Sequence, residues 1–333
     1  MSDLNSPIFH NEDAAREHLD GLRWPDGPLC PHCGSRDQAT KMAGKSHRPG
    51  LYQCNACRKP FTVTVGTVFE RSKIPLHKWL LAMYLMSSSK KGMSAHQLHR
   101  MLGVTYKTAW FMAHRLREGM REPAPEGGMG GPGKTVEVDE TYVGGKAKNR
   151  KGKVPPKEAV VSLVERDGRV RSFHLPEVTS KTLRPILVTQ IDRKSYLMTD
   201  ESTVYMKPGT EFKGYGTVNH SIEEYVRKAF YHTNTVENYF SILKRGIIGV
   251  YHHVSQQHLK RYVGEFDFRY NYRHLTDAER ADAALKMVAG NRLAYRRTDQ
   301  AGYESSDEEV DPALARQAPT KTGRQQCQLM LAR

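Results

Sequence analysis

Two pairs of cysteines near the N-terminus constrain the fold of this chain more than any other feature. Cys30 and Cys33 form one Cys-x-x-Cys pair, Cys54 and Cys57 form a second, and about 20 residues separate them. The first residues of the chain are acidic and lack the apolar core of a secretory signal, so metal ligation is expected before disulfides. Each pair can turn two thiolates toward one tetrahedral ion. The spacing therefore predicts a zinc ribbon with a structural Zn²⁺, since protein ligands fill all four positions.

Length and charge point to a multidomain protein with a polyanionic partner. The chain has 333 residues and a formal net charge of +15, which predicts two or three domains. Each phosphate neutralised by Lys or Arg releases counterions, so this charge favours a nucleic-acid partner, although charge alone fits a merely soluble protein equally well. No run of about 20 apolar residues is present, so no membrane span is expected and the chain is predicted to be cytoplasmic.

The segment after the ribbon has the pattern of a helix-turn-helix. Residues 76–86 carry an apolar helical stripe, Ser94 is placed to cap a short second helix, Gly103 to end it, and Thr105 to cap a third helix running to about residue 118. A short helix, a Gly turn and a basic helix are typical of a DNA-binding unit. A plain helical hairpin that only packs is the alternative. The side chains on the third helix that would reach phosphates or base edges are Tyr106, Lys107, Arg115 and Arg117.

The pattern changes to strands after a Gly- and Pro-rich linker at residues 121–133. Val136 and Val138 alternate with acidic residues, so a strand over 134–143 should bury the valines and present Asp139 on the opposite face. Two strands joined by the Asp167-Gly168 turn follow, at 158–165 and 169–175. A helix over 180–191 and a buried strand at 196–198 then deliver Asp200. Three strands, a helix and a strand are the opening order of a ribonuclease H-like α/β fold with a mixed sheet, in which Asp139 and Asp200 would meet.

A third acidic side chain comes from a later helix. Between His232 and Gly246 one stripe is apolar, and Glu237 lies on another, so this helix would face the sheet with the first and the two aspartates with the second. Lys244 and Arg245, one to two turns on, would meet a DNA phosphate. Three carboxylates are hard oxygen ligands of the kind that hold two Mg²⁺ or Mn²⁺ ions for phosphoryl transfer. We therefore predict that Asp139, Asp200 and Glu237 are the catalytic metal ligands.

Several ordered motifs resemble those of bacterial insertion-sequence transposases of the ISXO-like, zinc-ribbon kind, which are related to the eukaryotic Merlin elements. The resemblance covers about residues 30–274. The motifs that carry it are Val138-Asp139-Glu140-Thr141-Tyr142-Val143-Gly144-Gly145, Leu197-Met198-Thr199-Asp200-Glu201, Val218-Asn219-His220, His232-Thr233-Asn234-Thr235-Val236-Glu237-Asn238, Lys244-Arg245-Gly246, Gly249-Val250-Tyr251-His252 and residues 265–273. Asp139 and Asp200 match the family's first two metal ligands. The third position varies in that family, and Glu237 matches its acidic form, with Asn234 as a rival for a supporting role.

The resemblance implies a DDE-type DNA transposase that binds the terminal repeats of an insertion sequence, cleaves at the element ends and joins 3′-hydroxyls to target DNA. Its partners would be double-stranded transposon-end and target DNA. Two ends must be held together, so a homo-oligomer on DNA is expected, in a bacterial, nucleoid-associated setting. A catalytically silent DNA-binding regulator and a metal-dependent nuclease that hydrolyses without joining are the alternatives.

Some roles stay open at the level of sequence. A strand neighbour points to the other face, which favours Asp139 over Glu140, whereas Glu201 follows a strand end and is less securely excluded. His220 and His232 fit either an assisting or a packing role. A basic loop just after the first catalytic strand fits DNA contact or a solvated loop; its charged residues are Lys146, Lys148, Arg150 and Lys151.

The domain organisation predicted from these patterns is α+β and multidomain. It comprises an N-terminal segment (1–25), the zinc ribbon (26–70), the helix-turn-helix (74–120), the linker (121–133), the ribonuclease H-like catalytic domain (134–275), a C-terminal helix (276–296) and a disordered polar tail (297–333).

Overall fold

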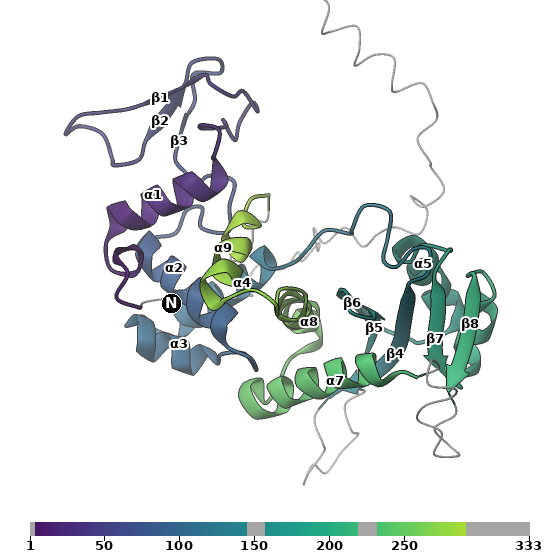
Figure 1. Cartoon of the computed structure of the whole chain (residues 1–333). Coiled ribbons are helices and arrows are strands. Elements are labelled where there is room, and N and C mark those ends of the chain that lie inside the picture. The colour runs from purple at the N-terminus through teal and green to yellow at the C-terminus, as the bar shows by residue number, and fades with distance from the viewer. Residues whose placement is uncertain (1–3, 145–156, 219–231, 291–333) are drawn as a thin grey trace, which may run out of the picture. The chain divides into compact units, whose positions relative to one another are not determined.

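The computed structural model describes residues 4–144, 157–218 and 232–290 (Figure 1). A helical part with a small sheet precedes a second part built on a five-stranded sheet. Among these residues no helix is both long and apolar enough to cross a membrane. The basic loop side chains Lys146, Lys148, Arg150 and Lys151, together with His220 and the tail, lie outside the described residues.

The N-terminal ribbon is a three-stranded antiparallel sheet that follows helix α1 (Glu12–Arg23). Its strands are β1 (Ala39–Lys41), β2 (Tyr52–Cys54) and β3 (Pro60–Phe61). Strand β3 ends at Phe61, because the chain turns there and the Val65 amide donates to the Thr62 carbonyl at 3.0 Å. Tyr52 and Phe61 stack with ring centroids 5.6 Å apart and bury the aromatic face of the sheet.

Helices α2 (Leu76–Ser88), α3 (Ala95–Leu102) and α4 (Tyr106–Gly119) follow the ribbon, with the predicted caps in place. The Ser94 hydroxyl accepts from the Gln97 amide at 3.2 Å, and the Thr105 hydroxyl accepts from the Thr108 amide at 3.3 Å. Gly103 ends α3 in the left-handed conformation, with φ +60°, which a residue without Cβ adopts readily. The sequence signals for these helix ends are therefore confirmed.

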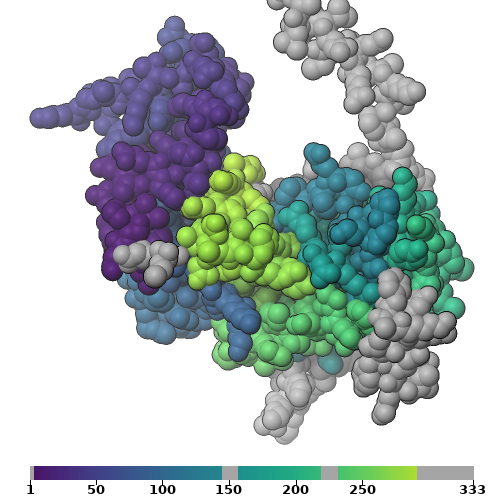
Figure 2. Space-filling model, viewed as in Figure 1, coloured from purple at the N-terminus to yellow at the C-terminus, as the bar shows by residue number. Residues whose placement is uncertain are grey.

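The ribbon, α1–α4 and the late helix α9 (Asp277–Lys286) share one hydrophobic core. That core extends from Phe9 in the short 3₁₀ turn η1 (Pro7–Phe9) to Val288. Figure 2 shows the yellow-green residues of α9 against the purple N-terminal residues, and α9 contacts both α1 and α2. The zinc ribbon, the helix-turn-helix segment and the C-terminal helix, which the sequence predicted as separate units, therefore pack into one core. The C-terminal helix, predicted over 276–296, ends at Lys286.

The second part is a mixed sheet with strand order β6-β5-β4-β7-β8. Strand β4 pairs antiparallel with β5, and β5 with β6, whereas β4–β7 and β7–β8 are parallel. The hairpin turn predicted at Asp167-Gly168 is present, with Asp167 at φ +57°. The strands are β4 (Thr135–Val143), β5 (Glu158–Glu165), β6 (Val170–Leu175), β7 (Tyr196–Asp200) and β8 (Gly214–Val218).

Helices cover both faces of this sheet. On one face Val136 and Val138 pack with Leu187 of α5 (Ser180–Gln190), together with the turn η2 (Thr203–Tyr205). The other face packs against α7 (Asn234–Gly246) and α8 (Gln256–Asn271), which the π-helical turn η4 (Ile247–Tyr251) connects. The one-turn helix α6 (Met206–Gly209) follows η2. The sheet is therefore the middle of three layers, with β4 and β7 at its centre.

The Gly- and Pro-rich linker is tied to this sheet at its C-terminal half. Met129 is 3% exposed, and its amide donates to the Gln190 carbonyl at 2.6 Å. The Gly131 amide donates to the Ser195 hydroxyl at 2.8 Å. The linker predicted for residues 121–133 is therefore packed against the sheet domain from Met129 on, because its glycines let the backbone lie close against the end of α5 and the start of β7.

Candidate metal and nucleic-acid sites

The four predicted cysteine ligands converge on one point. Their sulfur atoms all lie within 4.8 Å of one another. The Cys30 and Cys57 Sγ atoms are 3.7 Å apart, and those of Cys33 and Cys54 are 3.6 Å apart. A tetrahedral ion with Zn–S bonds of about 2.3 Å requires S–S edges of about 3.8 Å. Four thiolates in this geometry fit Zn²⁺ and leave no open coordination position, as expected for a structural site.

The backbone around the first pair is shaped for this convergence. The Gly34 amide donates to the Cys30 carbonyl at 2.9 Å, and Gly34 has φ +71°, which turns the chain after Cys33. Cys30 and Cys54 are buried, and both belong to the core that continues into α1. The metal site and the first helices are therefore packed into the same hydrophobic core.

Strand pairing sets the first two predicted acidic ligands side by side. In the parallel pair β4–β7, Thr135 is opposite Tyr196 and Glu137 is opposite Met198, an offset of 61 residues. Continuing that offset by two residues places Asp139 opposite Asp200, the last residue of β7. Register partners on neighbouring strands point to the same face of a sheet. The two carboxylates thus share one face.

Glu237 approaches that face from the first turn of α7, which packs on β4. The electrostatics of Asp139 report the proximity of all three acids. The pKa of Asp139 is raised to about 7, chiefly by burial and additionally by the charges of Asp200, Glu140 and Glu237, while a hydrogen bond from the Glu140 amide opposes the rise. A buried carboxyl group whose pKa is raised beside other carboxylates is a candidate for a functional site.

Each of the three carboxylates also has a local hydrogen-bond donor. Asp139 Oδ1 accepts from the Glu140 amide at 2.7 Å, and Asp200 Oδ1 accepts from the Ser202 amide at 3.1 Å. Glu237 Oε1 accepts from the Thr233 hydroxyl at 2.8 Å. Among the residues described, only the cysteine set brings its ligand atoms within 4.8 Å of one another, so the acids are more widely spaced.

The residues left open by the sequence have distinct places. Glu140 accepts a hydrogen bond from the Tyr205 hydroxyl, and Tyr205 belongs to the core on the α5 face, opposite the face of Asp139. Glu201 is exposed just after β7, and Asn234 is exposed as the first residue of α7. His232 lies with Nδ1 3.2 Å from Glu137 Oε1, so it lies beside a buried carboxylate that sequence reasoning overlooked.

That overlooked residue is Glu137, which is fully buried on the same face of β4 as Asp139. Its Oε2 accepts the amides of Thr235 at 2.8 Å and Val236 at 3.1 Å, the first turn of the helix that carries Glu237. Its Oε1 accepts from Arg166 Nε at 2.6 Å. The sequence offered one sign of this role, since Glu137 stands between two valines predicted to be buried. The sequence could not identify the partners of Glu137, because Thr235 is 98 residues away.

Tyr205 is a second residue that sequence reasoning missed. It is fully buried, and its pKa is raised, first by burial and then by the charges of Glu140, Asp139 and Asp200. Its hydroxyl therefore lies close to the acidic site from the α5 side. A tyrosine in a short irregular segment carries no sequence signal for that position.

The predicted DNA contacts on α4 divide into two groups. Tyr106, 45% exposed, and Lys107 lie on the surface at the start of the helix. Arg115 and Arg117, 6% and 2% exposed, lie in the interior, so their prediction as DNA contacts is wrong. Arg115 donates to the Glu70 carbonyl at 2.7 Å. Outside α4, Lys244 and Arg245 are exposed in the last turn of α7.

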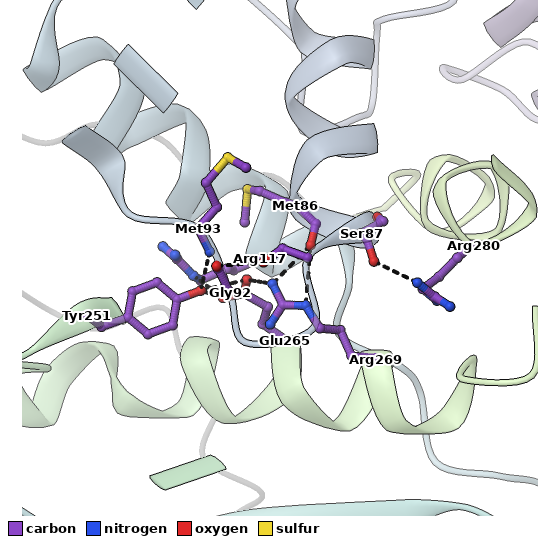
Figure 3. Close-up of polar contacts among 10 residues, drawn as sticks. Met86, Ser87, Gly92, Met93, Arg117, Tyr251, Glu265, Arg269 and Arg280 are labelled. Atoms are coloured by element: carbon purple, nitrogen blue, oxygen red, sulfur yellow. Dashed lines mark hydrogen bonds and ion pairs between the residues drawn. The ribbon is translucent and has the colours of Figure 1, made fainter. Parts of the chain in front are cut away.

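Arg117 belongs to a buried ionic network between α4 and α8 (Figure 3). Its Nε donates to Glu265 Oε2 at 2.6 Å, and the other oxygen of Glu265 accepts from Arg269. The Tyr251 hydroxyl donates to the same carboxylate at 2.8 Å, and Arg269 donates to the Met86 carbonyl at 3.0 Å. From the sequence, a basic residue on an amphipathic helix is expected to face solvent. Arg117 instead pairs with a buried carboxylate 148 residues further along the chain.

Comparisons with known proteins agree with this assembly of parts. Residues 130–271 match the model of the ISXO2-like transposase domain, and residues 10–60 match that of the transposase zinc-ribbon domain. A relative from Halobacterium salinarum, described as an uncharacterized protein in transposable element ISH50, is 27% identical over 279 residues. The match covers 78% of this chain and 91% of the relative.

Proposed function

Because this chain belongs to the ISXO2-like, zinc-ribbon transposases, we propose that it is a DDE-type enzyme that cleaves insertion-sequence ends and joins them to target DNA. The observation that carries the proposal is the strand register that sets Asp139 beside Asp200 under the helix bearing Glu237. The sheet order β6-β5-β4-β7-β8, with its two antiparallel and two parallel pairings, supports a ribonuclease H-like catalytic domain.

In this proposal Asp139, Asp200 and Glu237 supply the hard oxygen ligands for two Mg²⁺ or Mn²⁺ ions. When bound, two such ions about 3.5–4 Å apart would activate the attacking oxygen and stabilise the leaving oxygen of an in-line displacement. The chain's own contribution is to hold the three carboxylates on one face. Glu137 fixes the start of α7 against β4, and so sets the distance of Glu237 from the two aspartates.

DNA binding is assigned to exposed residues of two helices. We infer that α3, the Gly103 turn and α4 act as a helix-turn-helix, with Tyr106 and Lys107 at the exposed N-terminal end of its second helix. Lys244 and Arg245 are exposed on the helix that carries Glu237, where they would meet phosphates near the reacting strand. The ribbon would hold its Zn²⁺ as a structural element, and two copies of the chain would hold the two element ends.

The test is strand transfer in vitro. The purified protein is incubated with a labelled element-end duplex and a supercoiled plasmid, with Mg²⁺ or EDTA, beside the Asp200→Asn protein. Joined products that require both the metal and Asp200 are expected. The loss of rate should exceed the roughly 10–100-fold that partners of ligands usually cost, since Asp200 itself would bind the metal. End binding should persist in the variant.

The products separate the remaining alternatives. Cleaved ends without joined products would make the chain a metal-dependent nuclease, because water and a 3′-hydroxyl use the same ions. Footprinted end binding with neither cleavage nor joining would make it a DNA-binding regulator. Joining at the normal rate by the Asp200→Asn protein would remove Asp200 from the site.

A further inference from the structure

A cavity of about 340 Å³ lies between α4 and α8, apart from the acidic site. It opens at the exposed side chains of His253 and Gln257 and closes on the buried ring of His114. Both helices and the segment that leads into α8 contribute to it. The lining residues are Trp110, His114, His253, Val254, Ser255, Gln257, His258 and Tyr262.

The floor of the cavity carries an unsatisfied polar group. His114 is 1% exposed, and neither of its ring nitrogens has a hydrogen-bond partner. Its pKa is lowered to about 2, first by burial and then by the charges of Arg117, His258 and Arg261. The ring is therefore neutral and offers one N–H donor and one acceptor nitrogen. A buried polar group without a partner is costly, so a ligand that hydrogen-bonds to it would be favoured.

The walls of the cavity are aromatic rings. The Trp110 and His114 rings are 4.1 Å apart between centroids, and the His114 and His258 rings are 4.5 Å apart. Tyr262 closes the far side, with its ring 5.6 Å from His114. The rings are tilted to one another, by 52° between Trp110 and His114 and by 49° between His114 and His258, so each ring can offer only its own face to a flat ligand.

The charges around the cavity select among ligand classes. Arg117 is paired with Glu265, and Arg261 is paired with Glu118 at 2.9 Å and donates to His258 Nδ1 at 2.9 Å. Both guanidinium groups donate to these carboxylates, which leaves fewer of their N–H groups for a phosphate. Among the described residues, the histidines of the cavity do not bring three ligand atoms within 4.8 Å of one another, which disfavours a metal ion. The cavity therefore best fits a neutral, flat ligand with hydrogen-bonding groups at its edges. A nucleobase has those properties.

We propose that this cavity receives a single unpaired DNA base, stacked on Trp110 and hydrogen-bonded to His114. The proposal rests on the proposed function for its ligand, since it takes DNA as the substrate. The cavity opens beside α4, whose first residues are the proposed DNA contacts. A base that leaves the duplex there loses stacking to its neighbours and regains it on the aromatic wall.

The experiment compares two labelled hairpin duplexes of arbitrary sequence, identical except that one carries a single extrahelical adenine. Affinities are measured by fluorescence anisotropy for the full-length protein and four variants. Trp110→Ala removes the stacking surface, Trp110→Phe keeps an aromatic ring, and His114→Leu removes the ring nitrogens at similar volume. His274→Ala is the matched control, because His274 is exposed just beyond the far end of α8. Melting temperatures verify that each variant is folded.

The unmodified protein is expected to bind the bulged hairpin about tenfold more tightly than the paired one, as one stacked base would provide. Trp110→Ala and His114→Leu should lose most of this preference, whereas Trp110→Phe and His274→Ala should keep it. No preference in the unmodified protein, or an undiminished one in both cavity variants, would overturn the proposal. Strand joining is assayed separately with element ends. A protein that joins no strands can still prefer the bulged hairpin, and a protein without this preference can still join strands, so the two proposals fail independently.

Discussion

At the scale of single residues, the acidic site depends on a carboxylate that does not belong to it. Glu137 is buried, points to the same face as Asp139 and accepts the first amides of α7. An anion at a helix N-terminus is favoured by the unpaired amides and by the helix dipole. Here the anion lies two residues from one proposed ligand and holds the helix that carries another.

We predict that Glu137→Gln destabilises the protein and slows strand joining. The substitution leaves Arg166 without its carboxylate at a largely buried position, which should cost about 3 kcal/mol in unfolding free energy. It also places an amide N–H against the helix amides, so α7 should move away from β4. Urea unfolding and joining assays on the same sample measure both effects. Glu177→Gln, an exposed change on the same sheet domain, should leave both unaltered; equal behaviour of the two variants would contradict a positioning role for Glu137.

A second buried carboxylate predicts how stability responds to pH. Burial raises the pKa of Asp267 to about 6 against opposing hydrogen bonds from Tyr239 and Ser172. Because the protonated form is favoured in the folded protein, this contribution is complete below the unfolded pKa of 3.8 and is lost as the pH rises through about 6.

We therefore predict that Asp267→Asn flattens the pH dependence of stability between pH 4 and 7. The acid's share of the decline should be on the order of 2 kcal/mol, and urea unfolding at several pH values measures it. Asparagine has one acceptor oxygen where Asp267 uses two, so it can accept from the Ser172 amide or from the Tyr239 hydroxyl but not from both, and the variant should also be less stable at every pH. A slope identical to that of the unmodified protein would show that Asp267 does not titrate in this range.

At the scale of elements, the sequence predicted the helix ends and strand faces that depend on residues close to one another in the chain. The caps at Ser94 and Thr105, the turn at Gly103 and the valine alternation in β4 each involve residues within a few positions, so the sequence was enough to place them. Asp139 and Asp200 could be paired because a regular fold order connects their strands. Arg115 and Arg117 could not be placed, since a basic side chain on a helix has the same sequence pattern whether it faces DNA or a distant carboxylate.

The ribbon provides an element-scale prediction. Cys54 is fully buried in the core that also contains α1, so losing the metal should affect helices outside the ribbon. We expect Cys54→Ser to reduce the bound zinc and to lower the melting temperature by more than about 5 °C, since metal binding contributes folding free energy directly. Zinc content and thermal unfolding are measured together. Cys327→Ser, which changes a cysteine outside the two pairs, is the control and should leave both unchanged. A zinc-free variant with the original melting temperature would contradict this coupling.

At the scale of the whole molecule, α8 contributes to two hydrophobic cores. Leu259, Val263 and Phe266 pack with α7 and the sheet, whereas Phe268 packs with the helices near the N-terminus. Glu265 and Arg269 of the same helix connect it to Arg117 of α4 and to the Met86 carbonyl of α2 (Figure 3). Tyr262, a wall of the cavity between α4 and α8, stacks on the Arg117 guanidinium at 4.0 Å. A ligand in that cavity would therefore contact a residue stacked on the network that connects α4 and α2 to α8.

This connection predicts which substitutions the network tolerates. Glu265→Gln leaves two buried arginines without a carboxylate, so unfolding free energy should fall by about 3–5 kcal/mol. Replacing all three charges by apolar groups, as Arg117→Met, Glu265→Leu and Arg269→Met together, should recover most of that loss, because desolvated charge and not lost packing is the cause. Urea unfolding of the single and triple variants measures this. A triple variant as unstable as Glu265→Gln would mean that the hydrogen bonds to Met86 and Tyr251, which both variants weaken, hold α8 in place instead.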